Sequence, residues 1–373
     1  MVIIFIAFIF RLLLAFYDGA DLPGGDQDAI RFHLEALEYS KHLTNKSIFV
    51  ESSYTYSRGW MYSVFLGFLY NFFNTSSHVF ASFVSCLTWL LSALIFRAIL
   101  LKLNFRKNNI IIAVTLYCFA FPTSIIYSVI TLREVYILFF FNLLFLLIIN
   151  VHDTKNTIIK FLNIVFIFFI FYLLTLLHVA HLFFITIFPI LVICYFLIKK
   201  LNLRKSFLFI TGILIICFLS YFGITENIFI MGKNYQMGHF VNDHYQARAS
   251  YYVKKDIIVL TYSLETLFTH SLKNLYYYLF QPTISKVENF KDTVMMIENI
   301  LRAILIYLII KKSLLKFNRK ILFNIILIMF MTMELIYSQV TINYGTASRH
   351  HVPVMGIMIL LALYPVRKDK LDK

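Results

Sequence analysis

Charged residues are scarce in this chain of 373 residues. Only 14% are Asp, Glu, Lys or Arg, whereas 60% are hydrophobic, and long apolar runs recur from one end to the other. A soluble domain carries about 25% charged residues, so the composition excludes an ordinary soluble protein. Because a helix that crosses a bilayer needs about 20 mostly apolar residues, the sequence predicts an all-α fold, a polytopic transmembrane helical bundle.

Cysteine is also rare. Cys86, Cys118, Cys194 and Cys217 each lie inside an apolar run, and no two of them have the CxxC spacing. This pattern favours neither a disulfide framework nor a cysteine metal site. We expect all four to be small buried side chains.

Acidic residues are outnumbered: 19 Asp and Glu against 34 Lys and Arg leave a net charge of +15. In a soluble protein such an excess suggests nucleic acid, but cytoplasmic loops of membrane proteins concentrate Lys and Arg. Here 18 of the 34 cations fall in four short connections and the C-terminal tail, together with only three acids, Asp153, Asp369 and Asp372. We therefore assign these segments to the cytoplasm and expect contacts with membrane lipids and none with nucleic acid.

Ten candidate spans separate the basic segments from longer or more unusual connections, and the two kinds of connection alternate. This alternation places both termini in the cytoplasm and makes the N-terminal run the first span, not a removed signal. The chain is then a single membrane domain, 1–373, with outer-face elaborations at 18–78 and 223–292. The predicted spans are 2–17, 79–101, 109–128, 134–151, 157–177, 182–198, 206–222, 293–311, 320–338 and 351–366.

Two apolar stretches are not counted as spans. Residues 57–73 are short and begin with Arg58, Gly59 and Trp60, and residues 256–281 contain polar breaks and a tyrosine cluster. We predict that both are interfacial helices on the outer surface, the first alternatively re-entrant. Counting 57–73 as a span would also place the basic loop at 102–107 outside the cytoplasm and reverse the side of every later loop.

The stretch DGADLPGGDQDAIRFH, residues 18–33, contains four aspartates beside an apolar run. A helix is predicted at 26–43, and Asp26 or Asp28 is suited to cap its start. Capping does not account for four aspartates together with His33, so these residues are candidates for acid–base chemistry.

The same predicted helix is amphipathic. Ile30, Leu34 and Leu37 form an apolar stripe, and Arg31 with Glu35 lies on the other side.

The stretch FPTSIIYSVITLREVYILFF connects two predicted spans at the outer face. Pro122 is expected to end or kink the first of these helices, and Glu134 to begin the second. A glutamate at a helix N-terminus is favoured by the helix dipole, but the adjacent Arg133 opposes it. Arg133 is therefore as well explained by a function as by a structural role.

Two further outer stretches combine cations with aromatic or histidine side chains. HFVNDHYQARASYYVKK supplies His244, Tyr245 and Arg248, and NYGTASRHHVP supplies Arg349 and His350. Arginine suits phosphate oxygens and aromatic faces suit sugar rings. Anchoring to lipid headgroups is the alternative at both places.

Charges inside the predicted spans are few. Glu298 and Arg302 are spaced i, i+4 and can pair. Arg11 and Glu334 also need partners, because charges in the bilayer core are usually paired, and a contact between these two is one possibility.

With these pieces in place, the chain resembles polytopic glycosyltransferases of the GT-C type. The resemblance lies in the N-terminal span, the acidic outer loop, the GWMYSVFLGFLYNFF helix and the following span that ends in FRAILLKLNFRK. The segments GADLPGGDQDAIRFH, PTSIIYSVITLRE, YLFQPTISKVENFKDTVMMIENI and NYGTASRHHVP are further similar to membrane proteins of bacterial surface-polysaccharide gene clusters, including O-antigen polymerases (Wzy-type). The first loop lacks an adjacent acidic pair, and its nearest equivalent is Asp26-x-Asp28.

The resemblance implies roles for individual residues. Asp26, Asp28 or His33 would act as the general base on an acceptor hydroxyl. The sequence identifies no cofactor, and a divalent metal is compatible with this chemistry. The expected phosphate-binding residues are Arg58, Arg133, Arg248 and Arg349, and the expected substrate contacts are Glu134, His244, Tyr245 and His350.

The resemblance also implies an enzyme of the bacterial inner membrane that uses polyprenyl-linked donors on the outer face. A polymerase of undecaprenyl-pyrophosphate-linked repeat units, working with a chain-length regulator protein, is the first expectation, and the 13 Lys and Arg assigned to the outside favour it. Transfer of a single sugar from a polyprenyl monophosphate is the alternative. A flippase or transporter is the third expectation. Such proteins concentrate polar residues at mid-depth of the membrane, whereas the polar residues of this chain gather at one face.

Overall fold

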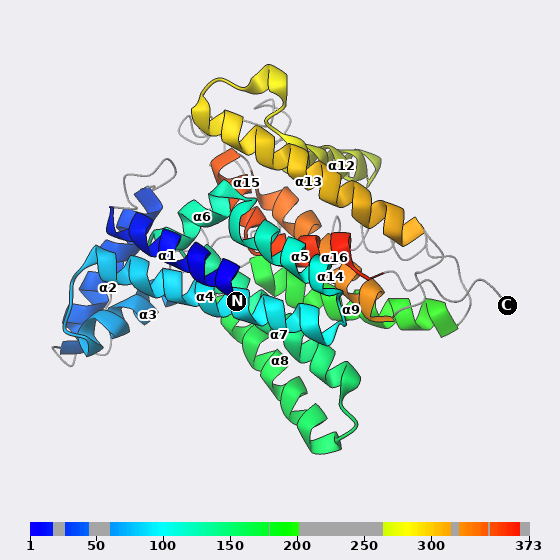
Figure 1. Ribbon diagram of the computed structural model, residues 1–373, viewed down its shortest axis with the longest axis horizontal. Coiled ribbons are helices and arrows are strands. Elements are labelled where there is room, and N and C mark those ends of the chain that lie inside the picture. Colours follow the sequence, from blue (N-terminus) through cyan, green and yellow to red (C-terminus); the bar gives the residue numbers. More distant parts are fainter. Residues whose placement is uncertain are drawn as a thin grey trace. The chain divides into compact units, whose positions relative to one another are not determined.

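A computed structural model describes residues 1–17, 27–44, 60–178, 180–200, 264–314, 321–341 and 344–365 (Figure 1). These residues form α-helices and one short 3-10 helix, with no β-strand among them. The all-α prediction is therefore confirmed. The helices divide into two compact units, of which unit 1 is built mainly from residues 1–178 with 352–373, and unit 2 mainly from 179–311 with 318–351.

The helices of unit 1 form a bundle around α4. Helix α4 packs against α1 and α7, helix α7 packs against α8, and the C-terminal helix α16 packs against α5 and α7. Trp89 and Phe141 are fully buried in this bundle. The helices of unit 1 are α1 (Val2–Phe16), α2 (Gln27–Thr44), α3 (Trp60–Phe72), α4 (His78–Lys102), α5 (Lys107–Phe119), α6 (Pro122–Val129), α7 (Glu134–Asp153), α8 (Thr157–Leu177) and α16 (Met355–Leu363).

Small residues allow these helices to approach closely, as is common in membrane bundles. Ser85 and Ser92 are fully buried on α4. Ser92 shares a hydrogen-bonded triangle with Tyr117 of α5 and Asn142 of α7, with all three distances at 2.9 Å. A Cβ added at Gly356 of α16 would lie 2.9 Å from the amide oxygen of Asn142, so glycine permits the close packing of α16.

In unit 2, helix α14 is the most buried element. It packs against α9, α12 and α15. The helices of unit 2 are α9 (Ala180–Lys200), α12 (Leu264–Phe280), α13 (Phe290–Leu314), α14 (Ile321–Val340) and α15 (Tyr344–His351), with a 3-10 turn at Ile284–Lys286.

Six of the described helices are long and apolar enough to cross a membrane: α4, α7, α8, α9, α13 and α14. Two bent pairs, α5 with α6 and α15 with α16, raise this number to eight if each pair is one span. The chain is therefore a multi-pass membrane protein. Helix α8 supports this assignment, because it exposes apolar side chains such as Phe161 and Phe168 along most of its length.

The predicted spans within the described residues agree with these helices, with two differences. The N-terminal span forms α1, whose 15 residues make about 22 Å of helix, shorter than the bilayer core of about 30 Å. The last predicted span, 351–366, becomes the shorter α16, which is bent by 57° from α15 where Pro353 interrupts the backbone hydrogen bonds. The predicted span 206–222 lies outside the described residues.

The expected break at Pro122 is confirmed. Helix α5 ends at Phe119, Pro122 occupies the first turn of α6, and the two helices are bent by 60°. Helix α7 then begins at Glu134, as predicted.

Candidate functional site

Helices α2 and α3 form a packed hairpin in unit 1 (Figure 1). Gly67 makes this close packing possible, because a Cβ there would lie 2.7 Å from both the backbone oxygen of Ala36 and the Cβ of Tyr39. Ala29 and Ala36 of α2 are fully buried. The small side chains of α2 thus face the protein.

The apolar stripe of α2 faces away from the hairpin contact. Ile30 and Leu34 have 52% and 58% of their surface exposed, and Phe68 and Phe72 of α3 are also exposed. In a membrane protein, an outward apolar stripe on an amphipathic helix is suited to the lipid interface. The hairpin therefore combines a lipid-facing surface with the polar residues described next.

Charged side chains of α2 form a short ladder. Arg31 lies 3.4 Å from the carboxylate of Asp28 and 3.5 Å from that of Glu35. Asp28 is in the first turn of α2, where a negative charge is favoured by the helix dipole, and its side chain is 40% exposed. Asp28 is therefore not the cap of α2 but an accessible carboxylate beside an arginine.

Glu35 is different from Asp28 because it is buried. It is 4% exposed, and one carboxylate oxygen accepts a hydrogen bond of 2.6 Å from the hydroxyl of Ser63 on α3. Its other carboxylate oxygen is the one that faces Arg31. These contacts tie α2 to α3 and fix the position of Arg31.

His33 lies on the same hairpin and contacts two aromatic rings. Its Nδ1 is 2.8 Å from the hydroxyl of Tyr70, and its ring is 5.4 Å from that of His78. Burial, and then the nearby His78, lower the pKa of His33 below its usual value of 6.5. The imidazole is therefore neutral at pH 7 and able to accept a proton.

Arg133 has a structural explanation that its position in the sequence conceals. It is the N-cap residue of α7, but its Nη1 donates a hydrogen bond of 3.0 Å to the carbonyl of Leu177, the last residue of α8. A cation is favoured at a helix C-terminus, so the unfavourable place on α7 is offset at α8. Its guanidinium also lies 5.7 Å from the ring centre of Phe32 on α2, which brings it to the hairpin.

Phe32 is the residue around which the charges of this region gather. It is buried, with Arg31 at 5.0 Å on one side and Tyr62 of α3 at 5.2 Å. Glu134, the first residue of α7, is also buried and has one carboxylate oxygen without a hydrogen bond. Asp28, His33, Arg133 and Glu134, which the sequence marked as separate candidates, thus belong to one unit, where Asp28 and His33 are on α2 and Arg133 lies against Phe32 of α2.

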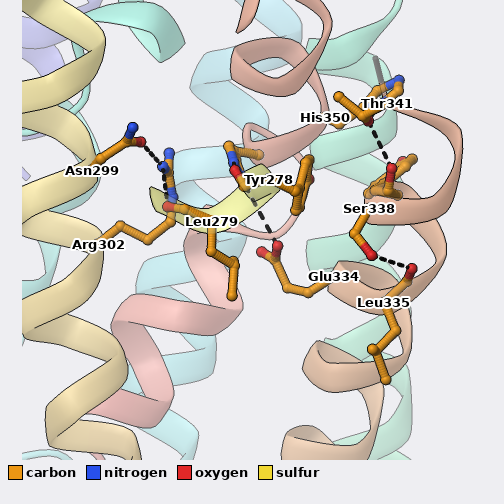
Figure 2. Close-up of polar contacts among 11 residues, drawn as sticks. Tyr278, Leu279, Asn299, Arg302, Glu334, Leu335, Ser338, Thr341 and His350 are labelled. Atoms are coloured by element: carbon orange, nitrogen blue, oxygen red, sulfur yellow. Dashed lines mark hydrogen bonds and ion pairs between the residues drawn. The ribbon is translucent and has the colours of Figure 1, made fainter. Parts of the chain in front are cut away.

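A second cluster of polar side chains is buried in unit 2 (Figure 2). Glu334 of α14 is 1% exposed, and one of its carboxylate oxygens lies 3.5 Å from the Nδ1 of His351. The Nε2 of His351 is 3.0 Å from the carbonyl of Tyr278 at the end of α12. Since a carbonyl only accepts, Nε2 carries a proton and Nδ1 faces Glu334.

Arg302 of α13 belongs to the same cluster. It donates hydrogen bonds to the carbonyl of Leu279 and to the side-chain oxygen of Asn299. Its charge is close enough to act on both Glu334 and His351. Figure 2 shows Arg302 and Glu334 reaching from opposite sides toward the chain at Tyr278 and Leu279.

His350 is held in a hydrogen-bonded chain beside this cluster. Thr341 donates its hydroxyl proton to the carbonyl of Tyr337 at 2.7 Å, so its oxygen accepts from the Nδ1 of His350, also at 2.7 Å. The ring of His350 stacks on Tyr337, whose hydroxyl is 2.8 Å from the Nε2 of His181. The predicted site residue His350 is therefore buried in a framework, while Arg349 beside it on α15 is partly exposed.

Arg11 and Glu334 lie in different units, so the suggested contact between them stays a prediction. Arg11 is fully buried, donates to Ser128 and to the carbonyls of Ala7 and Cys118, and stacks 3.6 Å from the ring centre of Trp89.

Five predicted site residues lie outside the described residues: Asp26, Arg58, His244, Tyr245 and Arg248. Within the described ranges, no three His, Cys, Asp or Glu side chains come together to hold a metal ion.

Sequence reasoning missed Glu35, Glu334, His351 and Arg302 as site residues. Only the presence of charges at Arg302 and Glu334 inside apolar runs signalled the second cluster.

Comparisons with known proteins found no matching family model, no similar curated protein and no similar solved structure.

Proposed function

We propose that this chain is a membrane glycosyltransferase that uses polyprenyl-linked sugar donors at the outer face of the bacterial inner membrane. Its most specific form is a polymerase of undecaprenyl-pyrophosphate-linked repeat units of a surface polysaccharide, with both termini in the cytoplasm. The observation that carries the proposal is the α2–α3 hairpin. There an accessible carboxylate, a neutral histidine and two arginines adjoin an apolar stripe suited to lipid.

These groups suit the chemistry of glycosyl transfer from a lipid phosphate. The acceptor hydroxyl must lose a proton as it attacks the sugar, and Asp28 or His33 would take it. The polyprenyl phosphate or pyrophosphate leaves with negative charge, and Arg31 and Arg133 would stabilise that charge. Asp26 and the outer arginines Arg58, Arg248 and Arg349 remain candidates for the same roles.

The outward apolar stripe supports a lipid-linked substrate. Ile30 and Leu34 are on the same helix as Asp28 and His33. A polyprenyl chain lying along this stripe would keep its phosphate in the headgroup zone, within reach of the charged ladder.

The proposal is tested in cells that lack the chromosomal copy and carry variants of the chain. Arg133→Ala and Arg349→Ala should each shorten the surface polysaccharide to single repeat units on a gel. If the polysaccharide keeps its normal length in both variants, at normal protein levels, the proposed phosphate contacts are ruled out.

A second candidate function, transport or flipping of the lipid-linked saccharide, is favoured by one specific observation. Two helix pairs are sharply bent, α5–α6 and α15–α16, and broken helices often surround the substrate site of transporters. Proteoliposomes loaded with a fluorescent lipid-linked oligosaccharide separate the two functions. Movement of the lipid to the other leaflet without any new glycosidic bond would favour transport.

A further inference from the structure

The polar cluster of unit 2 contains both donors and acceptors that the described part of the protein leaves without a hydrogen bond. The donors are the Nε of Arg302 and the Nδ2 of Asn299, and the acceptors are both carboxylate oxygens of Glu334. None of these three side chains is more than 6% exposed. Since buried polar groups are normally paired, each unpaired one calls for an explanation such as a missing ligand.

Backbone carbonyls hold the side chains of this cluster through other atoms, so the unpaired atoms named above are left for a ligand. Arg302 is anchored through its Nη1 to the Leu279 carbonyl, 3.4 Å away, and His351 is anchored to the Tyr278 carbonyl. Both anchors are at the end of α12, and Figure 2 shows Arg302 of α13 and Glu334 of α14 reaching toward it. Such second contacts fix the orientation of a side chain before a ligand arrives.

The mixture of unpaired groups selects the class of ligand. A phosphate ion would satisfy the donors of Arg302 and Asn299, but it brings no donors for the two unpaired carboxyl oxygens of Glu334. A metal cation would satisfy Glu334, but Arg302 would repel it. A hydroxyl group accepts and donates at once, so several neighbouring hydroxyls on one ring match unpaired donors and acceptors together.

We infer that Arg302, Asn299 and Glu334 form a buried sugar-binding subsite within unit 2. The inference rests on the proposed function in that a glycosyltransferase needs a place for an uncharged sugar ring. It deepens that function by assigning the ring, as distinct from the phosphate, to this cluster. His351 lies beside this subsite, with its Nδ1 3.5 Å from a carboxyl oxygen of Glu334, and the bond from its Nε2 to the Tyr278 carbonyl fixes the ring.

The test measures sugar binding by the purified full chain in detergent. Saturation-transfer NMR would be recorded with three methyl glycosides: those of a hexose, a 6-deoxyhexose and an N-acetylhexosamine. At least one glycoside should show transfer, and Glu334→Gln and Arg302→Lys should each weaken its binding about tenfold or more, because Gln lacks the second acceptor oxygen of Glu334 and Lys lacks the Nε donor of Arg302. Asn324→Ala is the matched control, because Asn324 is also buried on α14 but bonds to Tyr195, and it should bind as the unchanged chain does.

Several results would overturn the inference. They are no transfer to any of the three glycosides, transfer that survives in both variants, or competition by inorganic phosphate equal to that of the glycoside. A high-resolution structure with ordered water alone at these atoms in the presence of the glycoside would also overturn it. Thermal unfolding of each variant shows whether it is folded. Glycoside binding by a chain that transfers no sugar would support the subsite but contradict the proposed glycosyltransferase function. The failure of one proposal can therefore be told from the failure of the other.

Discussion

Glu35 in unit 1 and Glu334 in unit 2 are two buried carboxylates in opposite situations. Glu35 accepts a hydrogen bond from Ser63 and faces Arg31. Glu334 has no hydrogen bond to either oxygen, and the Nδ1 of His351 lies 3.5 Å from one of them. The hydrogen bond to one oxygen of Glu35 ties two helices together, whereas a buried carboxyl group with no hydrogen bond to either oxygen costs stability and is retained for function. We therefore regard Glu35 as framework and Glu334 as a ligand-binding group.

The largest effect is expected at the base of the hairpin site. Asp28 and His33 are the two candidates for the general base. Substitution of the one that takes the proton, by Asp28→Asn or His33→Gln, should lower the rate of sugar transfer about a hundredfold. Initial rates of the purified variants on the same lipid-linked substrate make this measurement. Loss of activity in only one of the two variants identifies the base. Full activity in both would show that neither Asp28 nor His33 is the base.

The next prediction compares the two buried carboxylates directly. Glu35→Ala should lower the free energy of unfolding by about 2–3 kcal/mol, because it leaves the buried Ser63 hydroxyl without its partner and removes one of the two carboxylates beside Arg31. Glu334→Met, which removes a buried carboxyl group that has no hydrogen bond, should leave the melting temperature unchanged or higher. Thermal melting of both variants in one detergent is the measurement. An equal loss of stability in the two variants would contradict the view that Glu35 stabilises the fold and Glu334 does not.

A smaller loss is expected at the helix contact of the hairpin. Gly67→Ala should destabilise the protein by about 1–3 kcal/mol, because the added Cβ meets backbone atoms of α2 that cannot move aside. Phe72→Ala is the control on the same helix, since Phe72 is 71% exposed. Equal melting temperatures for Gly67→Ala and the unchanged chain would show that α2 and α3 are not packed as described.

The smallest effect concerns pH. The folded protein lowers the pKa of His33, mainly by burial, so the unfolded chain binds more protons at this residue than the folded chain. Its contribution to stability is therefore complete above about pH 6.5 and is lost as the pH falls toward the lowered value. Melting temperatures from pH 8 to 5 should fall less steeply in His33→Gln. Parallel curves would contradict the described environment of His33.

Much of the helical layout could be predicted because it depends on local signals. Apolar runs marked the long helices, Pro122 marked the break between α5 and α6, and Glu134 marked the start of α7. The apolar stripe of α2 was also visible. Its outward direction was not, because a stripe turned to lipid and a stripe turned to a protein core have the same periodicity.

The site residues were harder to predict because their partners are distant in the sequence. Arg133 had no visible reason until its contact with the end of α8, 44 residues away, was known. Glu334 and His351 are on different helices, and no spacing rule joins them. The sequence alone marks which charges are unusual inside an apolar helix, whereas the fold decides which of them are satisfied.

Reconstitution of the purified chain into liposomes tests the proposed enzyme most directly. The substrate is a synthetic undecaprenyl-pyrophosphate-linked repeat unit, and the lipid-linked products are separated by size. We predict a ladder of products with increasing numbers of repeat units, absent when Asp28→Asn and His33→Gln are combined. A substrate recovered unchanged in length, or a ladder that persists in the combined variant, would contradict the account.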